Sequence, residues 1–314
     1  MTTDFLSSKT ASSIDSLRMR EAGKDLLSLA LMDARNHTLY LFALYERHLA
    51  ASNYQVPKLE HLNPPLWELG HVGWFQEWWL GRNMQRAQGN HCEPHHTRLA
   101  SIEPHADRWY DSSRVAHGTR WGLDLPDLAA TKNYLLETLE QSLELLEKTP
   151  DEDDALYFYR LALFHEDMHS EALVYMANTL GLKLELPSLS AFTPSAYAAR
   201  EAICMPATRW MLGSAPRGFI FDNEKGPHEV AVPEFEIDAQ PVSWARFVEF
   251  VDDGGYDRAE LWSPEGWAWL QAESRRAPRY VEQMRQGVLV QRLGQMQRIG
   301  ATQAAVHVSR HEAM

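Results

Sequence analysis

The chain has 314 residues, of which 45% are hydrophobic and 23% charged, as in a folded globular protein rather than a disordered one. Its formal net charge of −13 argues against a nucleic-acid partner, because binding phosphates requires a basic face. Cys92 and Cys204 are its two cysteines, which excludes a disulfide framework and favours a reducing cytoplasm. A chain of this length is expected to hold two domains.

The N-terminal segment 1–22, rich in Ser and Thr, is expected to be a loosely ordered tail. It lacks the basic start, apolar centre and cleavage site of a secretory signal. Apolar runs stay well short of the roughly 20 residues that a membrane span needs. The sequence therefore predicts a cytoplasmic protein that is not inserted in a membrane.

Apolar residues at helical spacing predict an N-terminal four-helix bundle over 23–185. The connection 85–125, rich in His, Pro, Asp and Ser, is expected to hold short helical pieces and is long enough to carry function. The four predicted helices cover residues 24–51, 66–82, 125–149 and 154–181, the last ending at Gly181.

Composition changes after Leu186, where a stretch rich in Pro, Ser and Ala predicts an interdomain linker over 186–205. Beyond it, VAVPEFEIDAQPVSW alternates apolar and polar residues, the pattern of half-buried strands. The predicted fold class is therefore α+β, with a four-helix bundle followed by a second domain over 206–314.

The stretch LFHEDMHSEA places His165 and His169 four residues apart on a predicted helix, where both can reach one metal ion. Such a pair also arises by chance among 14 histidines, so a polar helix face is the competing interpretation. Their face also carries apolar residues that indicate the bundle interior: Leu161, Leu173 and Met176.

His71 is a candidate third ligand, because LWELGHVGWFQEWW places it on a helix that is apolar nearly all round. A third imidazole from another helix would complete a three-histidine face with open coordination positions. Three neutral imidazoles suit Fe(II), Zn, Ni or Cu, and the sequence does not choose among these metals.

Other polar residues of the predicted helices are not interpreted as metal ligands. His37 is interpreted as a histidine of the bundle core or one that orients a ligand, because it lacks a partner four residues away. Glu166, Asp167 and Glu171 could orient imidazoles, but solvated carboxylates are expected for Glu166 and Asp167.

The loop cluster and the tryptophans are not assigned to a site. A cluster in the long connection resembles zinc ligands but lacks a matching second pair: His91, Cys92, His95 and His96. A tryptophan stripe is interpreted as core rather than as a ligand cage: Trp67, Trp74, Trp78 and Trp79.

LGHVGWFQEWW and FHEDMHSEA together resemble the DinB-like four-helix bundle of the ergothioneine-biosynthesis iron enzymes. WMLGSAPRGFIFDNEKGPHEVAVPEFEIDAQPVSWARFVEFVDDGGY is similar to the start of the formylglycine-generating-enzyme-like, C-type-lectin-like domain that follows that bundle. The combination resembles the sulfoxide synthases and the related selenoneine synthases, and HEDMHSE is closer to the selenoneine branch. It spans residues from about 25 to 270.

The resemblance implies that His71, His165 and His169 bind non-haem Fe(II). It implies an O2-dependent oxidoreductase that forms a carbon–chalcogen bond on hercynine, with a selenosugar as donor in the selenium branch. In the sulfur branch the donor is cysteine or γ-glutamylcysteine. Oligomeric state and the identity of further catalytic residues are not implied.

The family's second domain continues beyond VHVSRHEAM, through a segment that carries a proposed catalytic tyrosine and much of the substrate pocket. The chain is therefore interpreted as C-terminally truncated, with 206–314 an incomplete domain. We expect residues 275–314 to pack poorly and the chain to bind iron without efficient turnover.

Two other classes of protein remain as alternatives. A DinB-like bundle with three histidines also resembles thiol-dependent metal transferases, which use zinc or nickel and need no second domain. A lectin-like domain without its catalytic segment could instead give a non-catalytic hercynine-binding protein.

Overall fold

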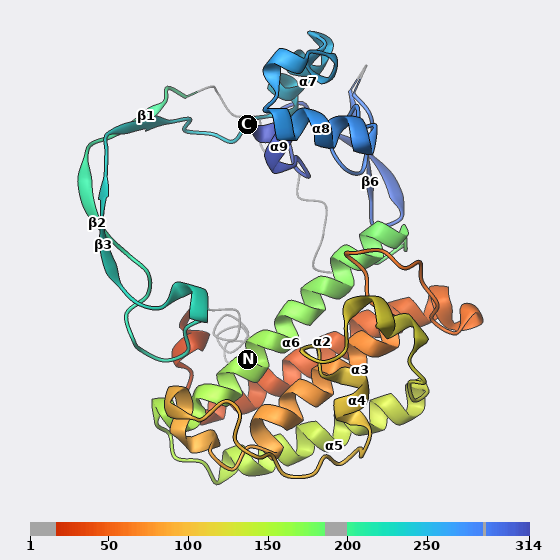
Figure 1. Cartoon of the computed structure of the whole chain (residues 1–314), viewed down its shortest axis with the longest axis vertical. Coiled ribbons are helices and arrows are strands. Elements are labelled where there is room, and N and C mark those ends of the chain that lie inside the picture. Colours follow the sequence, from red (N-terminus) through yellow and green to blue (C-terminus); the bar gives the residue numbers. More distant parts are fainter. Residues whose placement is uncertain (1–16, 186–199, 285–286) are drawn as a thin grey trace, which may run out of the picture. The chain divides into compact units, whose positions relative to one another are not determined.

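The computed structural model describes residues 17–185, 200–284 and 287–314, which form two compact units. The first unit contains the chain up to Met176 together with Leu212–His228, and the second contains Ala177–Met211 and Glu229–Met314. Long helices come first along the chain and short strands follow them (Figure 1). The predicted α+β class is confirmed.

Four long helices lie side by side in the first unit (Figure 1). They are α2 Lys24–Leu49, α3 Pro65–Gln76, α5 Leu128–Glu147 and α6 Asp153–Leu180, close to the four helices that the periodicity predicts. The axis of α3 continues into a π-helical turn, η3 Glu77–Gly81.

Local sequence signals explain where these helices begin and end. Pro65 occupies the first turn of α3, where its missing N–H costs nothing. Asp127 caps α5 by accepting a hydrogen bond from the Ala130 N–H. Gly181 ends α6 at φ +67°, a conformation that glycine adopts without strain.

The buried guanidinium of Arg35 on α2 forms hydrogen bonds to each of the other three long helices. Its Nε donates to Glu166 Oε1 on α6 at 2.7 Å, and its Nη2 donates to Gln76 Oε1 on α3 at 2.6 Å. Its Nη1 donates to the carbonyl of Leu135 on α5. Glu166 is 1% exposed, so the expectation of a solvated carboxylate is wrong: this side chain forms an ion pair in the core.

The connection between α3 and α5 contains short helices, as expected: η4 Arg86–His91, α4 Ala106–Tyr110 and η5 His117–Gly122. Glu77 fixes this connection to the bundle. Its carboxylate accepts 2.6 Å hydrogen bonds from Ser101 Oγ, from the Ile102 N–H and from the Tyr134 hydroxyl. The loop therefore has a defined path over the bundle.

Two segments outside the bundle helices also pack in the first unit. Of the predicted N-terminal tail, residues 1–16 lie outside the described residues, whereas Leu17–Glu21 form the 3₁₀ helix η1. Arg20 makes a 2.7 Å ion pair with Glu224. Phe219, 1% exposed, stacks on Phe164 of α6. Part of the stretch assigned to the second domain from sequence thus contacts bundle helices.

In its described residues, the second unit contains short strands, three α-helices and two 3₁₀ helices, η7 Gly255–Asp257 and η8 Ala259–Leu261. A ribbon pairs β1 Ile203–Met205 with β4 Phe235–Ile237, and β2 Thr208–Leu212 pairs with β3 His228–Val232. An antiparallel sheet has the order β5 Val281–Gln283, β6 Val288–Arg292 and β7 Gln295–Ile299. The α-helices are α7 Trp244–Asp252, α8 Pro264–Glu273 and α9 Arg310–Ala313.

Packing in the second unit differs from expectation in two ways. Val288 and Val290 of β6 are 3% and 4% exposed and lie in a core with Trp244 and Leu270, so the expectation of poor packing is wrong for this strand. Of the strands predicted to be half-buried, β4 is exposed throughout, as is its partner β1, whereas β3 alternates as predicted, with Val230 and Val232 half-buried and Ala231 exposed. Of the predicted linker, residues 186–199 lie outside the described residues.

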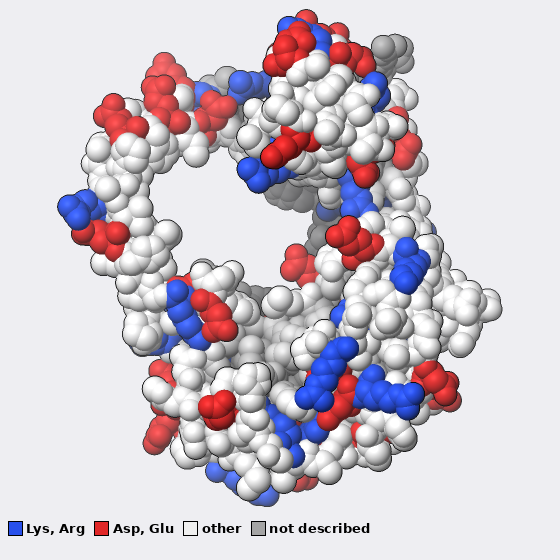
Figure 2. All heavy atoms as spheres, in the orientation of Figure 1, with Lys and Arg blue, Asp and Glu red and all other residues white. Residues whose placement is uncertain are grey.

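Within the described parts of the chain, none of the helices combines the length and apolar character needed to cross a bilayer. On the face drawn in Figure 2, Lys and Arg side chains are interspersed with Asp and Glu. A binding site for an anion on this face would therefore depend on a local group of basic residues rather than on a broad basic surface.

Candidate metal centre

Three histidines from two helices meet inside the first unit. His71 comes from α3, whereas His165 and His169 come from one face of α6, one turn apart. Their candidate ligand nitrogens all lie within 4.8 Å of one another. The ring centroids are 5.1 Å apart for His71 and His165, 4.9 Å for His71 and His169, and 4.5 Å for His165 and His169.

A backbone carbonyl fixes the His71 ring. Nδ1 of His71 lies 2.8 Å from the carbonyl oxygen of Tyr110, which can only accept a hydrogen bond. Nδ1 therefore carries the proton, and the lone pair of Nε2 remains for a metal ion. The ring also stacks on Trp67, with centroids 4.7 Å apart, and on Trp74 at 5.6 Å.

A buried carboxylate orients His169. Nδ1 of His169 donates to Glu68 Oε2, and Glu68 is 2% exposed. The other oxygen, Oε1, accepts from Asn63 Nδ2 at 2.6 Å, and Asn63 Oδ1 in turn accepts from Arg120 Nη1 at 2.8 Å. This is the carboxylate–histidine pair that commonly surrounds protein-bound metals, and it leaves Nε2 of His169 free to coordinate.

Ring stacking holds His165. Its imidazole lies parallel to Phe75, with centroids 3.5 Å and planes 4° apart. Phe75 comes from α3, one turn after His71, so the same helix supplies one histidine and the surface that supports another. The three rings are thus held by a carbonyl, a carboxylate and an aromatic ring, three different kinds of support.

Electrostatics keep two of these rings neutral. Burial, followed by the nearby His169, lowers the pKa of His71 to about 4. Burial and the neighbouring His169 and His71 lower the pKa of His165 well below its ordinary value. Burial alone would raise the pKa of Glu68, but His169 and the hydrogen bonds from His169 and Asn63 outweigh it and leave that pKa lowered. Neutral imidazoles at pH 7 offer lone pairs to a cation.

The donor set fits a divalent transition metal. It consists of imidazole nitrogens beside an ionised carboxylate, and aromatic side chains surround it. Among the residues that the structure describes, these three histidines form the group of at least three His, Cys, Asp or Glu side chains whose spacing would allow them to hold a metal ion. Three protein ligands would leave coordination positions open for other molecules.

Other predicted candidates lie apart from this cluster. His37 is exposed on α2, so its interpretation as a core or orienting histidine is wrong. In the loop cluster His91 and His95 are exposed, whereas Cys92 is buried with its Sγ 3.8 Å from Asn83 Nδ2. Glu171 is exposed on α6.

The tryptophans serve mainly as core. Trp67 and Trp74 are 1% and 5% exposed, and their indole N–H groups donate to the Trp109 carbonyl and to Asp107. The guanidinium of Arg120 lies 3.8 Å from the centre of the Trp67 ring. These indoles therefore already have neighbours on the bundle side of the site.

Sequence reasoning missed Glu68, Asn63 and the Tyr110 carbonyl. A signal for Glu68 exists in WELGH, where a carboxylate stands three residues before His71 on a helix that is otherwise apolar. A buried carboxylate needs a partner, and a histidine is the natural one beside a metal site. The role of Tyr110 has no such signal, because any residue has a backbone carbonyl.

The fold and this cluster define the class: a helical bundle with a three-histidine candidate metal centre, joined to a unit of short strands. Residues 190–314 match the sulfatase-modifying factor enzyme 1-like domain family. The chain is 31% identical to the hercynine oxygenase of Mycolicibacterium smegmatis over 225 residues, which are 70% of this chain and 49% of that protein.

Two further relatives agree. The hercynine oxygenases of Mycolicibacterium thermoresistibile and Mycobacterium tuberculosis are each 29% identical, over 257 and 261 residues, covering 54% and 57% of their lengths and 81% and 80% of this chain. The chain spans about half the length of the curated relatives it matches. The chain is thus similar to hercynine oxygenases over most of its length, and its residues 190–314 match the sulfatase-modifying-factor-like family.

Proposed function

We propose that the chain is the iron-binding part of an O2-dependent oxidoreductase that forms a carbon–chalcogen bond on hercynine. The observation that carries this proposal is the convergence of His71, His165 and His169, with the rings of His71 and His169 turned so that Nε2 can coordinate. The family relationship supports hercynine and O2 as substrates. A cytoplasmic location stays a prediction from the sequence.

Iron is the metal we assign to the three histidines. Three imidazoles alone also suit Zn, Ni or Cu, so the donor set does not choose the metal by itself. The relatives are named as oxygenases, and Fe(II), when bound, would supply the redox chemistry that a reaction of O2 requires.

The residues of the chain have separable roles in this proposal. Glu68 and the Tyr110 carbonyl hold the protons on the Nδ1 atoms of His169 and His71, so that each ring presents a lone pair. Phe75 prevents the His165 ring from turning. Trp67 and Trp74 exclude water from one side of the site, which strengthens electrostatic interactions there.

The chalcogen donor is the finer part of the proposal. HEDMHSE is closer to the selenoneine branch, so we assign a selenosugar as the donor. Cysteine or γ-glutamylcysteine is the donor of the sulfur alternative. Both donors would meet the same three histidines, so the choice depends on the donor-binding residues rather than on the metal centre.

The test is a hercynine-dependent reaction of the iron-loaded chain. Protein loaded anaerobically with one equivalent of Fe(II) is mixed with hercynine and then with O2, in the presence of a selenosugar, γ-glutamylcysteine or neither. We expect hercynine binding by calorimetry, O2 uptake above the no-donor level, and a product with a new carbon–selenium bond by mass spectrometry. His169→Ala and His37→Ala, treated identically, serve as the disabled variant and the matched control.

Each other outcome assigns a different function. A product with γ-glutamylcysteine and none with the selenosugar assigns the sulfur branch. Hercynine binding without O2 uptake assigns a binding protein. Thiol transfer under anaerobic conditions, with zinc or nickel in place of iron, assigns the transferase class. Absence of both hercynine binding and O2 uptake contradicts the proposal.

A further inference from the structure

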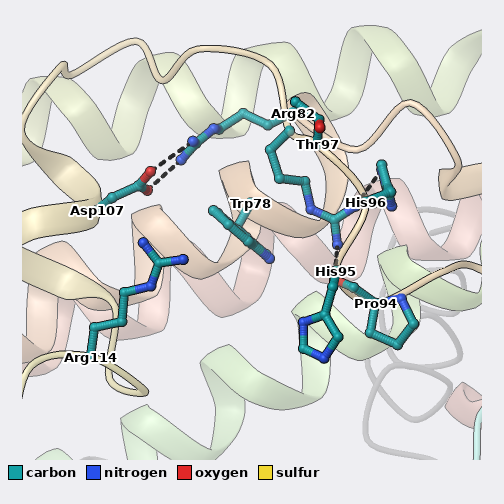
Figure 3. Close-up of a pocket in the computed structure, with 9 residues that line it drawn as sticks. Trp78, Arg82, Pro94, His95, His96, Thr97, Asp107 and Arg114 are labelled. Atoms are coloured by element: carbon teal, nitrogen blue, oxygen red, sulfur yellow. Dashed lines mark hydrogen bonds and ion pairs between the residues drawn. The ribbon is translucent and has the colours of Figure 1, made fainter.

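A polar cavity lies in the first unit, apart from the three histidines. Its volume is about 350 Å³, within the range of small-molecule sites. Figure 3 shows the Trp78 indole between Arg114 on one side and His95 and His96 on the other, with the ion pair of Arg82 and Asp107 along another edge. None of its lining residues belongs to the histidine cluster.

The ion pair gives the cavity one rigid, neutral wall. Arg82 donates from Nη1 and Nη2 to the two oxygens of Asp107, at 2.5 and 2.9 Å, and from Nε to the Leu99 carbonyl at 2.7 Å. Its guanidinium also lies 4.9 Å from the centre of the Trp78 ring. Hydrogen bonds from Arg82 lower the pKa of Asp107, so this carboxyl stays ionised and balances Arg82.

Arg98 brings a positive charge that is partly hydrogen-bonded: its Nη1 donates to the His96 ring, and its Nη2 donates to the Pro94 carbonyl at 3.4 Å. Its guanidinium lies 5.2 Å from the Trp78 ring and 4.9 Å from the Trp79 ring, which hold it in place. Its Nε is buried and has no hydrogen-bond partner among the described residues. Burial lowers the pKa of Arg98, so a neighbouring anion would favour its charged form.

Arg114 brings a second guanidinium, which forms an ion pair with Asp111 through its Nε. Its side chain is 75% exposed, and its Nε lies 3.3 Å from Asp111 Oδ2. In the described chain its two terminal amino groups have no hydrogen-bond partner, so both can donate to a ligand. Figure 3 shows its guanidinium directed toward Trp78. Arg82 is paired with Asp107 and Arg114 with Asp111, so among the described lining residues Arg98 is the guanidinium without a carboxylate partner, on a protein of net charge −13.

We propose that this cavity binds the oxyanion group of a small molecule, a carboxylate or a phosphate, between Arg98 and Arg114. A guanidinium fork matches the geometry of both groups, and charge-assisted hydrogen bonds to them are stronger than neutral ones. The stacking of Arg98 on two indoles means that little side-chain entropy is lost on binding. This assignment is independent of the metal centre and of the reaction proposed there.

The experiment is calorimetric titration of the full chain with inorganic phosphate and, separately, with succinate, at constant ionic strength set by sodium chloride. We expect saturable binding of at least one probe. Arg114→Gln should weaken it at least about tenfold, the usual effect of losing one charge-assisted contact. Arg108→Gln is the matched control, because Arg108 is an exposed arginine of α4 outside the cavity lining and should bind the probe as the native chain does.

The outcomes separate the possible ligands. Tighter binding of phosphate assigns a phosphate group, and tighter binding of succinate assigns a carboxylate. Equal affinities of Arg114→Gln and Arg108→Gln, or no saturable binding of either probe by the native chain, overturn the assignment. Because Arg114 is exposed, an unchanged thermal midpoint without ligand shows that its substitution leaves the fold intact.

Discussion

The bundle helices bury their apolar residues, whereas the ribbon of β1 and β4 leaves its residues exposed. The helices bury Leu27, Leu31 and Leu163 at 0%, 0% and 3% exposure, whereas every residue of β1 and β4 is exposed. A helix satisfies its own backbone and needs only one buried face, but an isolated two-stranded ribbon is marginal in water. Apolar burial therefore stabilises the bundle more than the ribbon, and the candidate metal centre lies in the bundle.

The largest expected effect in the bundle follows from breaking its buried ion pair. Glu166→Ala would leave the Arg35 guanidinium buried without its counter-ion, which costs about 3–5 kcal/mol of unfolding free energy. Urea unfolding followed by helical circular dichroism measures this cost. Glu171→Ala, on the exposed side of the same helix, should change stability by less than about 0.5 kcal/mol. Similar losses in the two variants would contradict the central role of the pair.

The second largest loss of stability is expected from disturbing the close packing of Gly70 against Tyr110. A Cβ added at Gly70 would lie 2.2 Å from Cζ of Tyr110, whose carbonyl accepts from His71. Gly70→Ala should therefore displace Tyr110, cost up to about 3 kcal/mol in thermal unfolding and weaken metal binding as well. At Gly122 an added Cβ meets no described atom within 4 Å, so Gly122→Ala is the control. Native-like stability of Gly70→Ala would show that Tyr110 moves at little cost.

Orientation of His169 should matter less than the ligands themselves. Glu68→Gln removes the charged acceptor of the His169 Nδ1 proton but keeps the size of the side chain. Such changes typically weaken metal binding about 10–100-fold, which is about 1.4–2.7 kcal/mol. A chelator competition assay measures the affinity, with Glu171→Gln as control. An affinity within twofold of the native chain would mean that Glu68 does not orient the ligand.

The pH dependence of metal-free stability tests the burial of His71. Its pKa is about 4 when folded, against an ordinary value of 6.5, so between these values the unfolded chain binds more protons. Stability contributed by this group therefore falls as the pH decreases, by about 2 kcal/mol between pH 7 and pH 5. Urea unfolding at both pH values should show a smaller fall for His71→Asn. An equal fall in both proteins would place the His71 ring in contact with water.

The smallest effect is expected in the ribbon. Ile237 of β4 is 53% exposed and pairs with Ile203 of β1, so Ile237→Thr should change the unfolding free energy by less than about 0.5 kcal/mol. Hydrogen exchange of the β1 and β4 amides should also be faster than that of the bundle core. A loss above about 1 kcal/mol would show that the ribbon is buried in solution, and the contrast with the bundle would fail.

The helices were predictable because their signals are local. Apolar spacing, Pro65 and Gly181 are visible in the chain, and α2, α3, α5 and α6 follow them closely. The alternation in VAVPEFEIDAQPVSW correctly predicts strands and the half-buried face of β3, but not the exposure of β4, because period two says which residues share a face and not what covers that face.

The candidate site was predictable in part. The spacing of His165 and His169 and the apolar surroundings of His71 identify the three histidines that the structure brings together. The position of Glu166 was misjudged because its partner, Arg35, lies 131 residues away in the chain. The same holds for the carboxylate of Glu68, whose contact with His169 joins two different helices. Long-range polar pairs leave no periodic signal in a single sequence.

The most direct test of the account is anaerobic titration of metal-free protein with Fe(II). The native chain is compared with His71→Ala, His165→Ala and His169→Ala, and with His37→Ala as an exposed-histidine control. We predict one equivalent bound by the native chain and by His37→Ala, and an affinity reduced by more than about 100-fold in the other three variants. Equal iron binding by all five proteins would contradict a shared site and return the three histidines to the polar interior of the bundle.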